Sequence, residues 1–107
     1  MDRSTLAIVE ATVHNLMLKH YDSLKKWLEG NGLRAPDPFI LANLIIDLIR
    51  SDLERDEKLF DETIEKIADE LRLKGKPMKL AQEALFHLMR IASLAYIRAI
   101  ALPSGRR

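Results

Sequence analysis

The chain has 107 residues, a length that fits a single domain around one hydrophobic core. It contains no cysteine, which excludes a disulfide framework and a thiolate metal site, and we expect a cytoplasmic protein. The formal net charge is only +1, whereas a generic nucleic-acid-binding protein has a clear excess of basic residues. Charged residues make up 31% of the chain and glutamine occurs once, a composition that leans towards a thermophilic source.

The first helix is expected over about 4–29. Asp2 or Ser4 supplies a capping side chain at its start. The segment 30–32, Gly-Asn-Gly, follows with residues that tolerate the positive φ of a helix end. Apolar residues recur between these limits at helical spacing, which predicts a long amphipathic helix.

The second and third helices are expected over about 38–54 and 57–74. Asp37 followed by Pro38 is a strong start signal, because aspartate caps and proline fits the first helical position. The apolar pattern lapses at Asp56 and then resumes more narrowly, so we favour a break there over one bent helix. Gly75 is expected to end the third helix.

The fourth helix is expected over about 77–102, followed by a short basic tail at 103–107. In the segment 80–102, successive residues are about 100° apart around the helix axis, and the polar residues fall within an arc of about 160°. The remaining arc of about 200° of the helix circumference is apolar. One neighbouring helix cannot cover that surface. The helix is long enough to suggest a membrane span, but its charged residues would be costly in hydrocarbon, and we expect none.

Short connections between helices favour a single-domain, all-α, up-down antiparallel four-helix bundle over residues 1–107. With helices two and four this apolar, we expect the chain to form a homo-oligomer, most simply a dimer, within a larger protein complex or alone. The expected interface residues come from these two helices: Phe39, Leu41, Ile45, Phe86, Met89, Tyr96, Ile97 and Ile100. Any one of them could instead belong to the core of the domain itself.

Charges are segregated along the chain. Residues 35–71 include four basic and eleven acidic residues, whereas residues 72–107 include eight basic and one acidic. This segregation predicts that the acidic third helix lies beside the basic fourth helix. The side chains expected to meet there are Glu62, Glu65, Asp69, Arg90 and Arg98.

Two carboxylate–histidine pairs at a spacing of four residues, Glu10 with His14 and Glu83 with His87, raise the question of a metal site. If the first and last helices are antiparallel neighbours, the two histidines come to similar heights. The known di-iron pattern needs Glu-x-x-His and further carboxylates, which this chain lacks. We therefore interpret each as an exposed Glu–His pair on a helix or as a partly buried, hydrogen-bonded histidine, and we expect no metal or cofactor.

The third helix carries Asp61, Glu62, Glu65 and Asp69, and the next helix carries the string Glu-Ala-Leu-Phe-His at 83–87. In these roughly 30 residues the chain resembles the all-α nucleotide pyrophosphohydrolases of the MazG type, whose adjacent helices carry Glu-Glu-x-x-Glu and Glu-x-x-Asp. The resemblance implies a Mg²⁺-dependent pyrophosphohydrolase as a remote alternative. The chain departs from that pattern, because Leu80 replaces a carboxylate and Asp61 replaces a glutamate.

A basic cluster surrounds the turn before the fourth helix and consists of Arg72, Lys74, Lys76 and Lys79. The start of that helix adds free backbone N–H groups that suit a phosphate. No aromatic residue lies in the cluster to stack on a base. The alternative function is therefore a nucleic-acid-associated helical protein that contacts the phosphate backbone.

Motifs for nucleophilic catalysis are absent from the sequence: it has neither Gly-x-Ser-x-Gly nor a complete phosphate loop. We therefore expect a non-enzymatic assembly or adaptor subunit that self-associates through its second and fourth helices.

Overall fold

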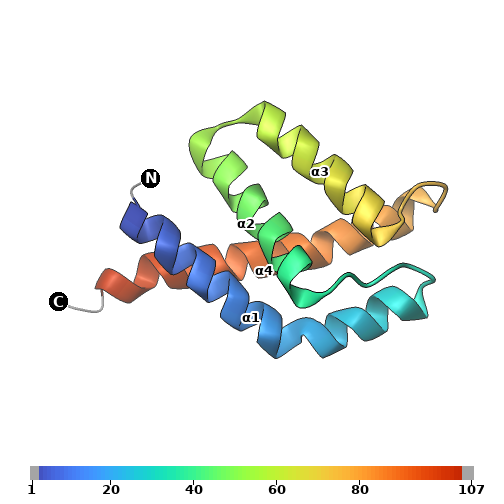
Figure 1. Ribbon diagram of the computed structural model, residues 1–107, viewed down its shortest axis with the longest axis horizontal. Coiled ribbons are helices and arrows are strands. Elements are labelled where there is room, and N and C mark those ends of the chain that lie inside the picture. Colours follow the sequence, from blue (N-terminus) through green and yellow to red (C-terminus); the bar gives the residue numbers. More distant parts are fainter. Residues whose placement is uncertain (1–2, 105–107) are drawn as a thin grey trace.

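The computed structural model describes residues 3–104, and within that range it contains four α-helices and no strand (Figure 1). The helices are α1 (Arg3–Gly30), α2 (Pro38–Glu54), α3 (Glu57–Leu71) and α4 (Met78–Ser104). The expected all-α helical bundle is confirmed, and so is the separation of α2 from α3. The capping candidate Asp2 and the last three residues of the expected basic tail lie outside the described residues.

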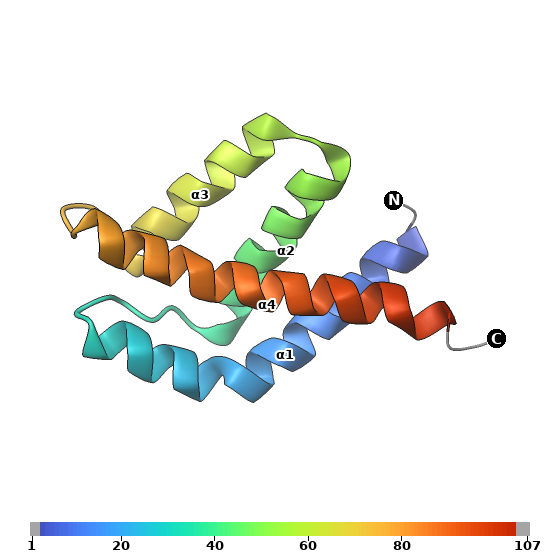
Figure 2. The same cartoon turned by 180° about the vertical axis from the view of Figure 1, so that it is seen from behind.

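The helices form two antiparallel pairs that lie at an angle to each other. α1 and α4 are the two long helices, and they run in opposite directions, while α2 and α3 form a hairpin on one side of them (Figures 1 and 2). α2 packs against all three other helices, whereas α3 packs mainly against α2. The chain is flat, with principal extents of 48 × 30 × 20 Å. α1 packs against both α2 and α4, so it is not a peripheral helix of this fold.

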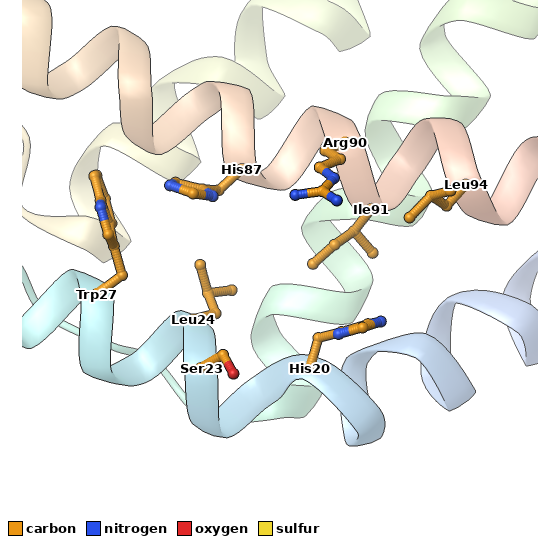
Figure 3. Close-up of a pocket in the computed structure, with 8 residues that line it drawn as sticks. All are labelled: His20, Ser23, Leu24, Trp27, His87, Arg90, Ile91 and Leu94. Atoms are coloured by element: carbon orange, nitrogen blue, oxygen red, sulfur yellow. The ribbon is translucent and has the colours of Figure 1, made fainter.

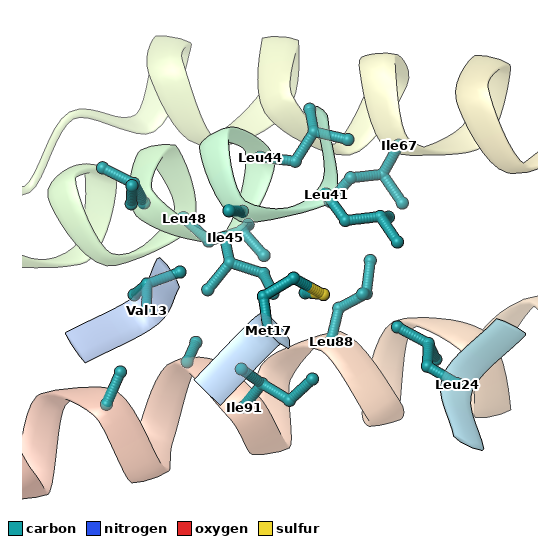
Figure 4. Close-up of a cluster of buried hydrophobic side chains, with 14 of the residues drawn as sticks. Val13, Met17, Leu24, Leu41, Leu44, Ile45, Leu48, Ile67, Leu88 and Ile91 are labelled. Atoms are coloured by element: carbon teal, nitrogen blue, oxygen red, sulfur yellow. The ribbon is translucent and has the colours of Figure 1, made fainter. Parts of the chain in front are cut away.

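The core lies where α2 meets its neighbours. Leu41 and Ile45 of α2 are fully buried, and the side chain of Leu41 lies between Ile67 of α3 and Leu88 of α4 (Figure 4). α1 contributes a stripe of its own, including the fully buried Val13. Eight residues of α2 are buried, which explains the nearly continuous apolar sequence of this helix.

Both expected helix starts in the middle of the chain are aspartate caps. The Oδ1 atom of Asp37 accepts a hydrogen bond from the backbone N–H of Ile40 at 3.0 Å, and Pro38 occupies the first helical position. Asp56 caps α3 in the same way, accepting from the N–H of Leu59 at 2.9 Å. Each cap satisfies one of the free N–H groups of a helix N-terminus.

Three helices end with the same backbone motif, in which a residue of positive φ follows the helix. These residues are Gly32 after α1, Arg55 after α2 and Arg72 after α3. After α3, the N–H of Arg72 bonds to the carbonyl of Asp69 and the N–H of Leu73 to that of Ala68, which is a Schellman motif.

The expectation that Gly75 ends the third helix was wrong, because α3 already ends at Leu71. Leu73, the residue after the positive-φ position, is buried, and its burial stabilises the earlier stop. Gly75 does have a positive φ of 80°, but it lies in the loop between α3 and α4.

The acidic side chains of α3 do not meet the arginines of α4. Glu70 forms an ion pair with Arg34 at 3.0 Å, and Asp69 pairs with Lys74 at 3.2 Å, so both join the loops at one end of the molecule. Among the described residues, Arg90 and Arg98 take part in no ion pair. The predicted pairing of the two helices through charge was therefore wrong, because α3 is positioned by its apolar contact with α2.

Candidate functional site

α4 has two apolar faces of opposite character. The face that packs into the core is rich in alanine, and its buried residues are Ala84, Leu88, Ile91, Ala92, Ala95 and Ala99. These small side chains allow α1 and α2 to pack close to α4. Five large apolar side chains of this helix lie on the opposite side, away from the core.

The outer face of α4 consists of Phe86, Met89, Tyr96, Ile97 and Ile100, all of them exposed to solvent. Phe86 is 65% exposed and Ile97 is 59% exposed, values usual for polar residues and not for large apolar ones. Together with Ser93, most of them follow steps of three and four residues along the helix. That spacing is the heptad pattern of a seam between two helices.

Most of the predicted interface residues are exposed, but two are not. Leu41 and Ile45 are fully buried in the core of the chain, so they are not available to another chain in this fold. Phe39 is 71% exposed at the start of α2, where its ring lies 5.4 Å from that of His14. The five predicted residues on α4 are all exposed and together form one face.

A shallow apolar groove of about 240 Å³ borders the outer face of α4. This groove lies between α2, the start of α3 and α4. Met89 and Tyr96 of the outer face line it, and so does Ser93. The rest of its lining is Leu48, Ile49, Asp52, Leu53, Phe60 and Ala92. The exposed apolar surface is therefore broader than a single helical stripe.

The predicted basic cluster is exposed at the end of the molecule where α3 connects to α4, but two of its lysines have partners within the chain. The Nζ atom of Lys76 donates to the carbonyl of Gly32 at 3.1 Å, and Lys74 pairs with Asp69. The first contact joins two loops, and the second is a solvent-exposed ion pair between the loop and α3. The cluster thus has a structural use that competes with phosphate binding.

The carboxylate–histidine pairs do not come together. His87 lies against Trp27 of α1, with ring centroids 4.5 Å apart. Since His14 precedes Trp27 by thirteen residues, it lies about 20 Å further along α1. Among the described residues there is no group of three or more His, Cys, Asp or Glu side chains placed to hold a metal ion. In the described part of the chain, the acidic residues of α3 that resemble pyrophosphohydrolase ligands therefore belong to no such group.

A second groove, of about 320 Å³, lies between α1 and α4, and we name it the α1–α4 groove (Figure 3). Its polar lining is His20, Ser23, His87 and Arg90, and its apolar lining is Leu24, Trp27, Ile91 and Leu94. This groove was not predicted from the sequence. Its signal is nevertheless present, since each helix contributes residues spaced i, i+3, i+4 and i+7.

Within the described residues, one segment, Met78–Ala101 of α4, has the length and apolar composition needed to cross a membrane. Only 28% of its most apolar window is buried in the chain. Helices that form the core of a soluble protein also meet these two criteria.

Comparison of the chain with models of protein families, with curated proteins and with solved structures finds no significant match.

Proposed function

We propose that this chain is a non-enzymatic assembly subunit that self-associates through the outer face of α4. One observation carries the proposal: α4 exposes five large apolar side chains on its outer face, whereas four of its six buried residues are alanines. Leaving Phe86, Ile97 and Ile100 in water forgoes roughly 25 cal/mol for each Å² of apolar surface that a partner would cover. Contiguous exposed apolar surface of this kind marks interaction sites.

The spacing of the outer face favours a helix as the occupant. Phe86, Met89, Ser93, Tyr96 and Ile100 are separated by three, four, three and four residues. Such a seam packs side chains into the holes of one facing helix. Ser93, a small residue in the middle of the seam, allows the two helix axes to approach closely.

A second copy of α4 fits this seam because the outer face is nearly symmetric about Ser93. Phe86 lies seven residues before Ser93 and Ile100 seven after it, while Met89 lies four before and Ile97 four after. An antiparallel second copy therefore brings large side chains of one helix beside large side chains of the other. This self-complementarity is what a two-fold interface requires.

Absolute mass in solution, measured by light scattering after gel filtration, tests the proposal. We expect a dimer of about twice the 12.3 kDa chain mass, and because its interface is apolar, high salt leaves it intact. Ile97→Glu combined with Ile100→Glu places two charges on the outer face of α4 and yields a folded monomer. Leu18→Glu is the matched control, because Leu18 is 73% exposed on α1 and lies outside the seam, so this variant remains a dimer. A wild-type monomer, or a dimer that survives both glutamates, contradicts the proposal.

A further inference from the structure

The α1–α4 groove differs from the outer face of α4 in both chemistry and position. It lies on the side of α4 that faces α1, and its volume of about 320 Å³ falls in the range of small-molecule pockets. Leu24 and Ile91 are buried, and their side chains form an apolar base between the two helices (Figure 3).

Every polar side chain that lines the groove can donate a hydrogen bond. Arg90 offers a guanidinium group, His20 and His87 offer ring N–H groups, and Ser23 offers a hydroxyl. No aspartate or glutamate is among the lining residues. A set of donors with a fixed positive charge and no carboxylate attracts an anion and repels a cation.

These donors are not committed to other groups. Among the residues that the structure describes, the side chains of His20, Ser23, His87 and Arg90 form no hydrogen bond or ion pair. In Figure 3 the guanidinium group of Arg90 lies between His87 and Ile91, at the rim of the groove. An unpaired guanidinium group is well suited to bidentate contact with a carboxylate or phosphate group.

The apolar lining of the groove combines one aromatic side chain with three aliphatic ones. Trp27 lies across one end, and its ring is inclined by 57° to the ring of His87 at a centroid distance of 4.5 Å. Leu94 and the two buried aliphatic side chains continue this apolar surface. A planar apolar body can lie on such a surface while its charged group reaches Arg90.

We infer that the α1–α4 groove binds a small organic anion, namely an aromatic carboxylate or an aromatic phosphate ester. Arg90 binds the anionic group, Ser23 and His20 add hydrogen bonds from the facing helix, and Trp27 contacts the ring. This site does not depend on self-association, because its residues come from α1 and α4 of one chain.

Trp27 is the only tryptophan in the chain, so its fluorescence reports directly on the groove. The experiment titrates the full chain with benzoate, with phenyl phosphate and with the neutral analogue benzyl alcohol, and confirms each affinity by calorimetry. We expect saturable binding of at least one of the two anions, with an affinity about tenfold or more higher than that of benzyl alcohol. A factor of this size is expected because a hydrogen bond to a charged group stabilises a complex by about 1.5–3 kcal/mol. The preference between the two anions identifies the charged group that the site takes.

Arg90→Gln removes the charge and keeps a polar side chain of similar length, so the anion should lose its tenfold advantage. Arg98→Gln is the matched control, because Arg98 is exposed on the same helix but does not line the groove, and its anion affinity should equal that of the wild type. Equal affinity for the anions and the alcohol would overturn the inference. So would equal losses in the two variants, or no saturable change with either anion at about 10 mM.

Discussion

The indole ring of Trp27 lies against the imidazole ring of His87, with centroids 4.5 Å apart and planes inclined by 57°. This contact joins the C-terminal half of α1 to the N-terminal half of α4 and is one of the contacts that align the two long helices. Both rings line the α1–α4 groove, with Trp27 at one end of it (Figure 3). His87 therefore contributes to the packing of α4 against α1, in addition to lining the groove.

Replacing His87 should weaken this alignment. We expect His87→Ala to lower the free energy of unfolding by about 1 kcal/mol, since an aromatic pair contributes roughly 0.5–1.5 kcal/mol. Urea unfolding followed by circular dichroism measures the loss. His20→Ala is the comparison, because His20 lines the same groove without a ring contact and should cost less. Equal losses for the two variants would mean that the ring contact contributes nothing.

The two arginines of positive φ offer a test of the helix ends. Arg72 has a φ of 59° and Arg55 a φ of 55°, a conformation that costs a non-glycine residue about 1 kcal/mol. We expect Arg72→Gly and Arg55→Gly each to raise the free energy of unfolding by roughly 0.5–1 kcal/mol.

The same substitution should act in the opposite direction inside a helix. Lys66→Gly, at an exposed position within α3, is expected to lower the free energy of unfolding by about 1 kcal/mol. Thermal or urea unfolding of the three variants supplies the comparison. If glycine destabilises at Arg72 as much as at Lys66, then α3 does not end at Leu71 in the way described.

The two faces of α4 predict an unusual pattern of mutational effects. Ala95 is fully buried, so Ala95→Leu overpacks the contact with the neighbouring helices and should cost about 1–3 kcal/mol. Phe86→Ala removes a far larger side chain but should change the stability of the monomer by no more than about 0.5 kcal/mol, because Phe86 is exposed.

Urea unfolding at low protein concentration, where self-association does not contribute, measures both variants. A cost of about 3–5 kcal/mol for Phe86→Ala, as expected for a buried phenylalanine, would place this side chain in the core and contradict the orientation of α4.

Much of the fold could be predicted because its signals are local. Asp37 with Pro38 marks the start of α2, and Asp56 marks the start of α3, through side chains that bond to backbone N–H groups three residues away. The apolar excess of α4 was also visible in the sequence. The five residues predicted on that helix are all exposed, and Met78 at its start is exposed as well.

The errors concern contacts between segments that are distant in the sequence. Charge alone suggested that α3 lies beside α4, but burial of Ile67 and Leu71 directs α3 onto α2. In the sequence, the apolar residues Leu41 and Ile45 cannot be distinguished from interface residues. They are buried in the core because α2 packs among the three other helices. The α1–α4 groove likewise depends on a helix alignment that no local pattern encodes.

Cross-linking of single-cysteine variants tests the central proposal, the antiparallel pairing of α4, most directly. The natural chain has no cysteine, so each introduced thiol is unique. In an antiparallel dimer centred on Ser93, two copies of Ser93→Cys lie together, whereas two copies of Ile100→Cys are separated by about 21 Å along the helices.

With a short thiol cross-linker at micromolar protein concentration, we expect Ser93→Cys to form covalent dimers. Ile100→Cys and the exposed control Leu18→Cys should stay monomeric on a denaturing gel, while an equal mixture of Phe86→Cys and Ile100→Cys should cross-link. Efficient cross-linking of Ile100→Cys to itself would indicate a parallel pair. No cross-linking of Ser93→Cys above the level of Leu18→Cys would contradict self-association through α4.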